Sequence, residues 1–534
     1  MTDARSTSWW GWGWADRWPD AEARQNLAVL LEAMHGLRGR PAEPPDMHSL
    51  VLPTCRLDIP TALQNWVSTS HEVRVRATWG RGFMDILRGF QGDFSVSPDA
   101  VARPGSAADV HALLTWAQSV GAIVIPRGGG TSVVGGVTLP KRSDRPVVVL
   151  DMTGMTAVTH VDPVSRLARI EAGATGPQVQ AQLAAHGFSL RHYPQSWEHS
   201  TVGGWVVTRA GGHYATGRTH FEDLVAGVEM VSPAGEYHTR VLPGSGAGPC
   251  PVRLLAGSEG TLGVVTAAHV RVQTTPAFRS QASVFFADFD NACAVARQIA
   301  QLGLWPTNLR LLDANEALLN QVADGTRHVL LLAFEDDVPT SDRLELALNI
   351  ALQGGGSCPA GPRHRAHAPG STSNDASVIW KNAFFDGPYL QSLLISFGLV
   401  ADTFETACTW HTFPALHAAL KSATQSIFDA AGGGKLSCRF THVYPDGPAP
   451  YYTFLCQSEP ATQEAIWRSI KTAVSDVLSA HGATITHHHA VGRLHRPWYD
   501  TERPALLGPG WNAMRSVFDP AGILNPGVLT DRNG

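Results

Sequence analysis

Three consecutive histidines, His487, His488 and His489, stand near the end of this 534-residue chain, in the stretch THHHAVGRL. Histidine titrates close to neutrality and also ligates metals, so the run could handle protons, bind an ion or be a polar strand without chemistry. In an extended strand side chains alternate, and His488 would then point away from the other two. A single ion could not easily take all three, and no Cys or Glu stands at ligand spacing. This pattern favours proton handling over a metal site.

Three segments rich in glycine, serine and threonine could bind phosphate. They are IPRGGGTSVVGG (125–136), YPQSWEHSTVGGWVVTRAGG (193–212) and GSEGTLGVVT (257–266). Consecutive glycines allow a turn whose N–H groups point inward and donate to phosphate oxygens. The first segment fits neither the Walker pattern nor G-x-G-x-x-G, and alone it could equally be a plain turn. Three such loops beside β-branched strands can wrap a long ligand with phosphates at one end and a ring at the other.

The bulk composition excludes several classes of protein. Hydrophobic residues make up 44% and charged residues 16%, which indicates a globular chain. The net charge of −5 without a dense Lys/Arg run argues against a nucleic-acid partner. The longest apolar run, 393–401, is too short to span a bilayer, and the N-terminus lacks the apolar core of a signal peptide. Seven scattered cysteines fit neither a disulfide framework nor a zinc ribbon, so we expect a cytoplasmic protein.

Hydrophobic periodicity indicates alternating helices and strands that would position these segments. Helices are predicted over 107–121, 176–187 and 291–303, and strands over 122–126, 145–152, 166–173, 282–289 and 328–335. Residues 353–377 are rich in Gly, Pro and Ser and are expected to form a long, mobile loop. The pattern predicts an α+β protein of at least two domains.

The order of the glycine-rich motifs, Pro-Arg-Gly-Gly-Gly-Thr-Ser, Ser-Thr-Val-Gly-Gly-Trp and Gly-Ser-Glu-Gly-Thr-Leu-Gly, resembles the FAD-binding domain of the vanillyl-alcohol-oxidase type. The stretches WWGWGWAD, FEDLV, LRLLD, HVYPDG and HHHAVGRL make the chain similar to the alkyldihydroxyacetonephosphate synthase family, from about residue 9 to 529 except 353–390. That family makes the ether bond of ether lipids with a non-covalent FAD.

The resemblance implies an α+β fold in which a two-subdomain FAD-binding domain (95–275) is joined to an α/β substrate, or cap, domain (276–485). A Trp-rich and helical segment (1–94) would precede them, and the C-terminal segment (486–534) would return to the flavin site. Thr131 stands where some members of this fold carry a histidine that bonds the flavin, so we expect non-covalent FAD.

The resemblance also implies which residues hold the cofactor. They are Pro126, Arg127, Gly128, Gly129, Gly130, Thr131, Ser132, Pro194, Gln195, Ser196, Trp197, Glu198, His199, Ser200, Val207, Thr208, Arg209, Ala210, Glu259, Gly260, Thr261, Leu262, Gly263, Val264 and Val265.

The catalytic residues that the resemblance implies are Tyr451, His487, His488, His489 and Arg310. Free tyrosine has a pKa near 10, and nearby cationic histidines or an arginine would lower that pKa and favour a basic phenolate. Gln391 stands where the synthases have a second arginine, and a neutral amide does not replace a guanidinium that binds phosphate. Arg363 and Arg365 are the candidates for the missing cation.

The expected activity is the exchange of the acyl group of acyl-dihydroxyacetone phosphate for a fatty alcohol through a flavin adduct. The alternative is an FAD-linked oxidoreductase that oxidises a 2-hydroxy acid or a related alcohol. A zinc hydrolase using the histidine run and a flavin-binding protein without turnover are further hypotheses. We expect a small-molecule or lipid-like substrate, no nucleic acid, no transmembrane segment, peripheral contact with a membrane, and a homodimer.

Overall fold

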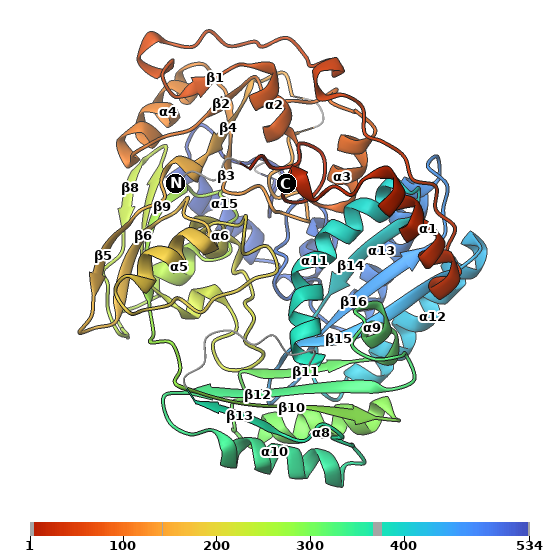
Figure 1. Cartoon of the computed structure of the whole chain (residues 1–534). Coiled ribbons are helices and arrows are strands. Elements are labelled where there is room, and N and C mark those ends of the chain that lie inside the picture. Colours follow the sequence, from red (N-terminus) through yellow and green to blue (C-terminus); the bar gives the residue numbers. More distant parts are fainter. Residues whose placement is uncertain (1–4, 141–142, 367–375, 532–534) are drawn as a thin grey trace.

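The computed structural model describes residues 5–140, 143–366 and 376–531 (Figure 1). Within these ranges the strands form sheets of four, five and seven strands. The first two sheets belong to the region expected to bind FAD, and the third belongs to the cap. Helix α1 (Ala21–His35) precedes the first strand, and helices α2 (His71–Thr78) and α3 (Phe83–Phe90) lie between the first and second strands.

The four-stranded sheet has the order β1-β2-β4-β3 and carries the first glycine-rich loop. Its strands are β1 (Val67–Ser68), β2 (Ala100–Ala102), β3 (Ile123–Arg127) and β4 (Val147–Asp151), and β2 and β3 run parallel to β4. The predicted helix is α4 (Ala107–Ser119), which begins where the side chain of Ser106 accepts the N–H of Asp109. Its apolar side packs on β2, β3 and β4, so the glycine loop leaves directly from the carboxyl end of β3.

The five-stranded antiparallel sheet has the order β5-β6-β9-β7-β8 and carries the other two glycine-rich segments. Its strands are β5 (Val158–Asp162), β6 (Leu167–Glu171), β7 (Val225–Ser232), β8 (Gly235–His238) and β9 (Val264–Arg271), with helices α5 (Gly176–Ala184) and α7 (Pro251–Leu255) beside it. The second segment was expected as a loop next to a strand, but Val202–Thr208 is a helix, α6. A Cβ on Gly203 would lie 2.8 Å from the Cβ of Ala172, so glycine lets this helix pack tightly on the sheet.

The seven-stranded antiparallel sheet of the cap has the order β13-β10-β12-β11-β15-β16-β14. Its strands are β10 (Phe278–Phe286), β11 (Asn308–Leu312), β12 (His328–Asp336), β13 (Arg363–Ala366), β14 (Val400–Glu405), β15 (Gly434–Val443) and β16 (Pro448–Cys456). Its helices are α8 (Phe289–Gln301), α9 (Ala314–Leu319), α10 (Ser341–Gln353), α11 (Ala376–Ser396), α12 (Phe413–Ala431) and α13 (Gln463–Ala480). In Figure 1, α11 runs along the sheet near β14.

The prediction of one long loop over 353–377 is wrong for part of that range. Residues 363–366 form the edge strand β13, paired with β10, and α11 begins at Ala376. Residues 367–375 lie outside the described residues. The composition was misleading because an edge strand needs only one partner and tolerates polar side chains.

The C-terminal segment packs against the glycine-rich segments. After α14 (Arg496–Glu502) and α15 (Leu507–Phe518), Leu524 forms a parallel bridge with Val124 on β3. Asn525 then donates its side-chain N–H groups to the carbonyls of Gly136 and Glu259, in two of the glycine-rich segments. The tail therefore ties these segments together.

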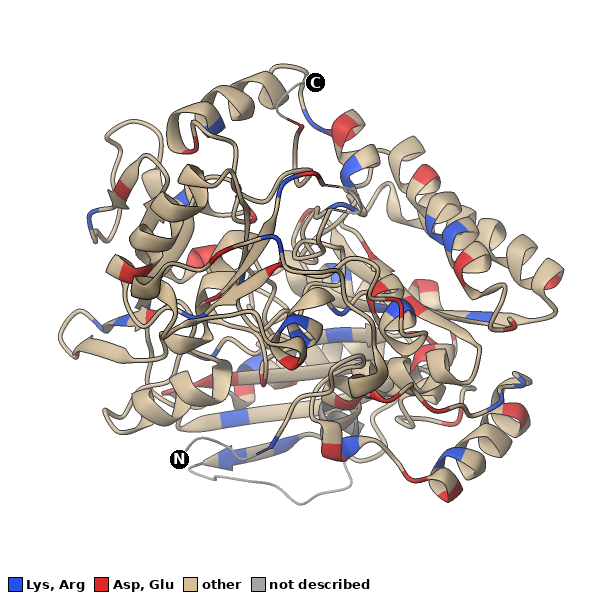
Figure 2. Ribbon diagram, turned by 90° about the horizontal axis from the view of Figure 1, so that it is seen from above, with Lys and Arg blue, Asp and Glu red and all other residues tan. Residues whose placement is uncertain are grey.

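Charge and hydropathy add two findings. Lys and Arg alternate with Asp and Glu over the elements in Figure 2 and form no continuous basic stripe there. None of the helices in the described part of the chain is long and apolar enough to cross a membrane.

Candidate active site

A cavity of about 660 Å³ lies between the glycine-rich segments and the cap sheet. The whole first loop, Pro126 to Ser132, lines it. The other predicted cofactor residues in its wall are Pro194, Gln195, Ser196, Ser200, Val207, Thr208, Ala210, Glu259, Gly260, Gly263, Val264 and Val265. The predicted residues outside this lining are Trp197, Glu198, His199, Arg209, Thr261 and Leu262. Trp12 of the N-terminal segment also lines the cavity, which the sequence did not indicate.

The first glycine loop fits closely against the segment that begins α6. A Cβ on Gly129 would lie 1.6 Å from the carbonyl oxygen of His199, and one on Gly128 would lie 2.0 Å from Oγ1 of Thr201. Gly130 has φ +66°, a conformation that favours glycine. Oγ1 of Thr201 is buried, has no hydrogen-bond partner among the described residues and belongs to a cavity-lining residue. This loop therefore leaves both space and a free hydroxyl for a bound group, which fits the expected FAD.

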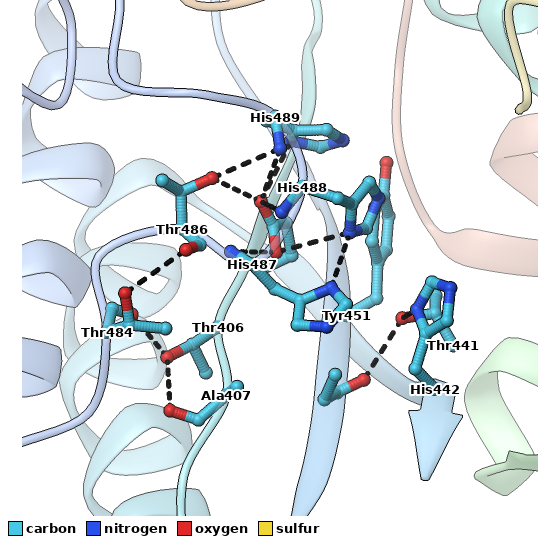
Figure 3. A network of polar contacts seen from close by, with 12 residues as sticks. Thr406, Ala407, Thr441, His442, Tyr451, Thr484, Thr486, His487, His488 and His489 are labelled. Atoms are coloured by element: carbon cyan, nitrogen blue, oxygen red, sulfur yellow. Dashed lines mark hydrogen bonds and ion pairs between the residues drawn. The ribbon is translucent and has the colours of Figure 1, made fainter. Parts of the chain in front are cut away.

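The histidine run is not an extended strand, which is the geometry on which the argument against a metal site depended. Residues 486–490 form an irregular loop around the buried carboxylate of Glu405, at the end of β14 (Figure 3). The N–H of His487 donates to Oε2 at 2.6 Å, and those of His488 and His489 donate to Oε1 at 3.1 and 3.0 Å. The Thr486 hydroxyl donates to Oε1 at 2.5 Å. The backbone N–H groups of this loop therefore make charge-assisted hydrogen bonds to the buried carboxylate, where in a strand they would bond to a neighbouring strand.

A second carboxylate holds the next residues of the same loop. Glu259, in the third glycine-rich segment, accepts the N–H of Val491 at 2.9 Å and that of Gly492 at 2.8 Å. Between the two anchors, Ala490 has φ +71°, so the chain turns there. The loop is thus fixed to the cap at one end and to the FAD-binding domain at the other.

The three histidine rings have different surroundings. His488 and His489 line the cavity, whereas His487 does not. His487 Nε2 lies 2.7 Å from the Tyr444 hydroxyl, and its Nδ1 lies 3.1 Å from Nδ1 of His488. Nitrogens of His442, His487 and His488 lie within 4.8 Å of one another, so this cluster could hold a metal ion. The alternation of side chains expected for a strand had argued against a metal site here. An ion at the two Nδ1 atoms would have to replace the hydrogen bond between them.

Burial sets the protonation of these groups. It lowers the pKa of His488 to about 3 and that of His489 to about 4, and it lowers the pKa of His487 well below its usual value. Burial also raises the pKa of Tyr451, against the opposing effects of Arg439 and of the bond to Thr403. The expectation of cationic histidines beside a phenolate is therefore wrong for the resting protein. Neutral imidazoles face the cavity beside a protonated tyrosine.

Tyr451 lies in the cavity wall on β16, while its neighbour Tyr452 packs in the core against Phe404. The Tyr451 hydroxyl donates to Oγ1 of Thr403 at 3.0 Å. The guanidinium carbon of Arg439 lies 3.9 Å from the centroid of the Tyr451 ring. Arg439, which the sequence did not single out, thus places a cation against the proposed catalytic tyrosine.

Arg310, on β11, is the clearest candidate for binding an anion. Its side chain is only 1% exposed, and it lines the cavity. Nε and Nη1 have no hydrogen-bond partner in the described part of the chain, and Nη2 donates to the carbonyl of His213 at 3.4 Å. Burial lowers its pKa to about 9, so the guanidinium remains charged at neutral pH.

Gln391, on α11, lines the cavity as expected. Its amide donates to the carbonyl of Ala401 and to Oδ1 of Asp402, each at 3.0 Å. Arg363 and Arg365 lie on the edge strand β13 and are not among the residues that line the cavity. Neither of them supplies the cation that Gln391 lacks.

Comparison with known proteins gives matches along most of the chain. The FAD binding domain family matches residues 98–240, and the family of FAD linked oxidases, C-terminal domain, matches residues 275–529. Alkyldihydroxyacetonephosphate synthases of Dictyostelium discoideum and Trypanosoma brucei brucei are 28% and 27% identical, each over 85% of this chain and 77% of its own length. Glycolate oxidase subunit GlcD of Bacillus subtilis is 24% identical over 81% of this chain and 89% of its own length. A solved alkyldihydroxyacetonephosphate synthase structure superposes with a TM-score of 0.79 at 22% identity, covering 97% of this chain and 98% of that chain.

Proposed function

We propose that this chain exchanges the acyl group of an acylated dihydroxyacetone phosphate for a fatty alcohol. The premise is its similarity to the FAD-linked oxidase families and to alkyldihydroxyacetonephosphate synthases. The observation that carries this proposal is the cavity itself. One wall is a glycine cradle suited to a dinucleotide, and the other presents neutral imidazoles, a tyrosine hydroxyl and a buried guanidinium.

FAD is the cofactor, and the first glycine loop would hold its pyrophosphate through backbone N–H groups, with the free hydroxyl of Thr201 nearby. Thr131 has no side-chain nitrogen to bond a flavin, which supports non-covalent binding. Bound FAD supplies an electron-accepting ring system beside the substrate carbon.

The residues of the cap that line the cavity have separable roles in the proposal. Arg310 binds the anionic head group through its two free N–H positions, and Gln391 contributes a neutral amide. Removing a proton from the carbon next to the substrate carbonyl needs a base, and a neutral imidazole of His488 or His489 can accept it. The Tyr451 hydroxyl, whose hydrogen goes to Thr403 in the resting protein, can turn and redirect that hydrogen to the substrate oxygen.

A group of apolar side chains in the cavity wall supports a lipid-like substrate. They are Leu319, Leu390, Leu394, Ala401 and Leu455. These residues belong to the hydrophobic cluster that includes Ala28 and Leu31 of helix α1. An alkyl or acyl chain placed here would bury apolar area at about 25 cal/mol per Å².

Peripheral contact with a membrane, a homodimeric state and a cytoplasmic location are finer parts of this proposal. Helix α1 supports the first, because Val29, Leu30 and Met34 are exposed on it while Ala28 and Leu31 pack inward. Co-sedimentation with phosphatidylcholine vesicles, sedimentation velocity and cell fractionation test the three parts separately. A protein that stays in the supernatant without vesicle binding would contradict the membrane contact.

The decisive test offers the FAD-loaded protein a palmitoylated dihydroxyacetone phosphate together with hexadecanol. We expect mass spectrometry to detect the alkyl ether and an equal amount of released palmitate. Tyr451→Phe keeps the ring and should lower turnover by about 10²-fold while FAD stays bound. Reduction of an electron-accepting dye by a 2-hydroxy acid, without ether formation, would instead establish the oxidoreductase alternative.

A further inference from the structure

We propose that Nε2 of His488 is the atom that accepts the substrate proton, and that a relay through His487, Tyr444 and Thr219 passes a proton on to His220. This inference rests on the proposed function, because it concerns the proton that must leave the substrate. It adds three residues, Tyr444, Thr219 and His220, that act through His488 and do not touch the substrate.

The relay is a continuous chain of hydrogen bonds leading from the cavity wall. Nδ1 of His488 lies 3.1 Å from Nδ1 of His487, whose Nε2 lies 2.7 Å from the Tyr444 hydroxyl. That hydroxyl lies 2.8 Å from Oγ1 of Thr219, which lies 3.2 Å from Nδ1 of His220. Nε2 of His220 lies 2.9 Å from the backbone carbonyl oxygen of His487.

The last hydrogen bond of the relay, between His220 and the carbonyl of His487, determines which atom donates in every other bond. A carbonyl only accepts, so Nε2 of His220 carries a hydrogen, and Nδ1 of the neutral ring must accept. Thr219 therefore donates to His220, and its oxygen accepts from Tyr444. The Tyr444 hydrogen is then committed to Thr219, so the Tyr444 oxygen accepts from Nε2–H of His487.

The same elimination determines which nitrogen of His488 is basic. With its hydrogen on Nε2, neutral His487 accepts at Nδ1, so Nδ1 of His488 carries a hydrogen and its Nε2 has a free lone pair. Glu405 supports this tautomer independently, because Oε2 of its carboxylate lies 3.4 Å from Nδ1 of His488 and can only accept. No hydrogen bond within the described residues reaches Nε2 of this cavity-lining ring.

Proton transfer along this chain balances without an oxidant. The substrate C–H bond breaks, its electron pair stays on the substrate and spreads into the neighbouring carbonyl, and an N–H bond forms at Nε2 of His488. The Nδ1 hydrogen of His488 moves to His487, the Nε2 hydrogen of His487 moves to Tyr444, and the hydroxyl hydrogens of Tyr444 and Thr219 move in turn. The final acceptor is Nδ1 of His220, whose half-buried imidazolium donates Nε2–H to a carbonyl. The same transfers in the opposite direction return the proton from His220 to Nε2 of His488.

The kinetic test breaks the relay at two separate bonds. Tyr444→Phe and Thr219→Val should each lower kcat by about tenfold or more with little change in KM, and FAD should stay bound. Thr219→Ser keeps the hydroxyl and should retain nearly wild-type kcat. The double variant Tyr444→Phe/Thr219→Val should be no slower than the slower single variant, because either single change already interrupts the proton relay completely. Tyr237→Phe, on β8 and away from the cavity, is the matched control.

A second measurement tests the relay without any substrate. In ¹⁵N-histidine-labelled protein, His487→Gln and His488→Gln spectra assign the two rings, and wild-type His488 should show the Nδ1–H tautomer. Tyr444→Phe removes the acceptor of His487 Nε2–H and should shift the ¹⁵N signals of His487, while Glu405 keeps His488 in the Nδ1–H tautomer. If the tautomers are as stated but the expected substrates are not turned over, the hydrogen-bond chain is correct, whereas the proposed function and the transfer of that substrate's proton are both refuted. An Nε2–H tautomer for wild-type His488, multiplicative losses in the double variant, or a Thr219→Ser variant as slow as Thr219→Val would each overturn the relay.

Discussion

Replacing Glu405 by glutamine should release the histidine loop. An amide has one acceptor oxygen instead of two, so if that oxygen keeps the donors at Oε1, an NH₂ group faces the N–H of His487. A hydrogen bond to a charged group contributes about 1.5–3 kcal/mol, and a buried donor without an acceptor costs about 1–3 kcal/mol. We therefore expect the free energy of opening the loop to fall by about 3 kcal/mol, which corresponds to about 10²-fold faster exchange of its amide hydrogens.

Hydrogen-exchange mass spectrometry of a peptide spanning 484–494, in the FAD-loaded protein, measures this change. Burial opposes ionisation of Glu405, but the neighbouring histidines and the Thr486 hydroxyl hold its pKa well below the usual value. A carboxyl with a depressed folded pKa stabilises above its unfolded pKa of about 4.3 and loses that contribution as the pH falls through the folded value. The difference between wild type and variant should therefore be the same at pH 5 and pH 8.

Glu502→Gln is the matched control for this experiment. Glu502 also accepts hydrogen bonds from the same segment, from the Thr484 hydroxyl and the Ile485 N–H, but it is exposed. Its replacement should change exchange by less than about threefold, the range of exposed surface substitutions. Unchanged protection of residues 487–489 in Glu405→Gln would refute the view that this carboxylate anchors the loop.

Three further predictions concern the cofactor and the base. The purified protein should carry one FAD per chain that acid releases, because Thr131 cannot tether a flavin, and flavin remaining in the precipitated protein would contradict this. Gly129→Ala should abolish FAD binding, because the new Cβ would collide with the carbonyl oxygen of His199. The control Gly246→Ala, whose Cβ would have nothing within 4 Å, should bind FAD normally. Equal flavin content in both variants would show that the first glycine loop does not bind the cofactor. Because burial lowers the pKa of His488 to about 3, protonation of this base should not reduce kcat/KM between pH 8 and pH 5, and a fall centred near pH 6.5 would show an ordinary, solvated histidine.

The sequence alone was sufficient for features that depend on local backbone chemistry. Glycine lacks a Cβ, so the triplet Gly128 to Gly130 predicts a backbone that approaches other protein atoms closely and that can take a positive φ. The structure shows both features in this loop. The helix over 107–119 and the strands after it follow from apolar periodicity, and the predicted α+β class agrees with the fold. Thr131 predicts, through the family resemblance, that no histidine of the first loop tethers the flavin.

Only the tertiary structure decided how the cavity groups are charged and which atoms they meet. Glu405 and His488 are 83 residues apart, and no spacing rule joins them. Their contact turns an expected strand into an irregular loop, because a buried carboxylate requires several N–H donors. The depressed pKa values of the histidines and the raised pKa of Tyr451 come from burial, which is a property of the packed molecule and not of the residue type. The sequence therefore identified the residue types of the site, while long-range packing determined which of them are neutral, charged or free to react.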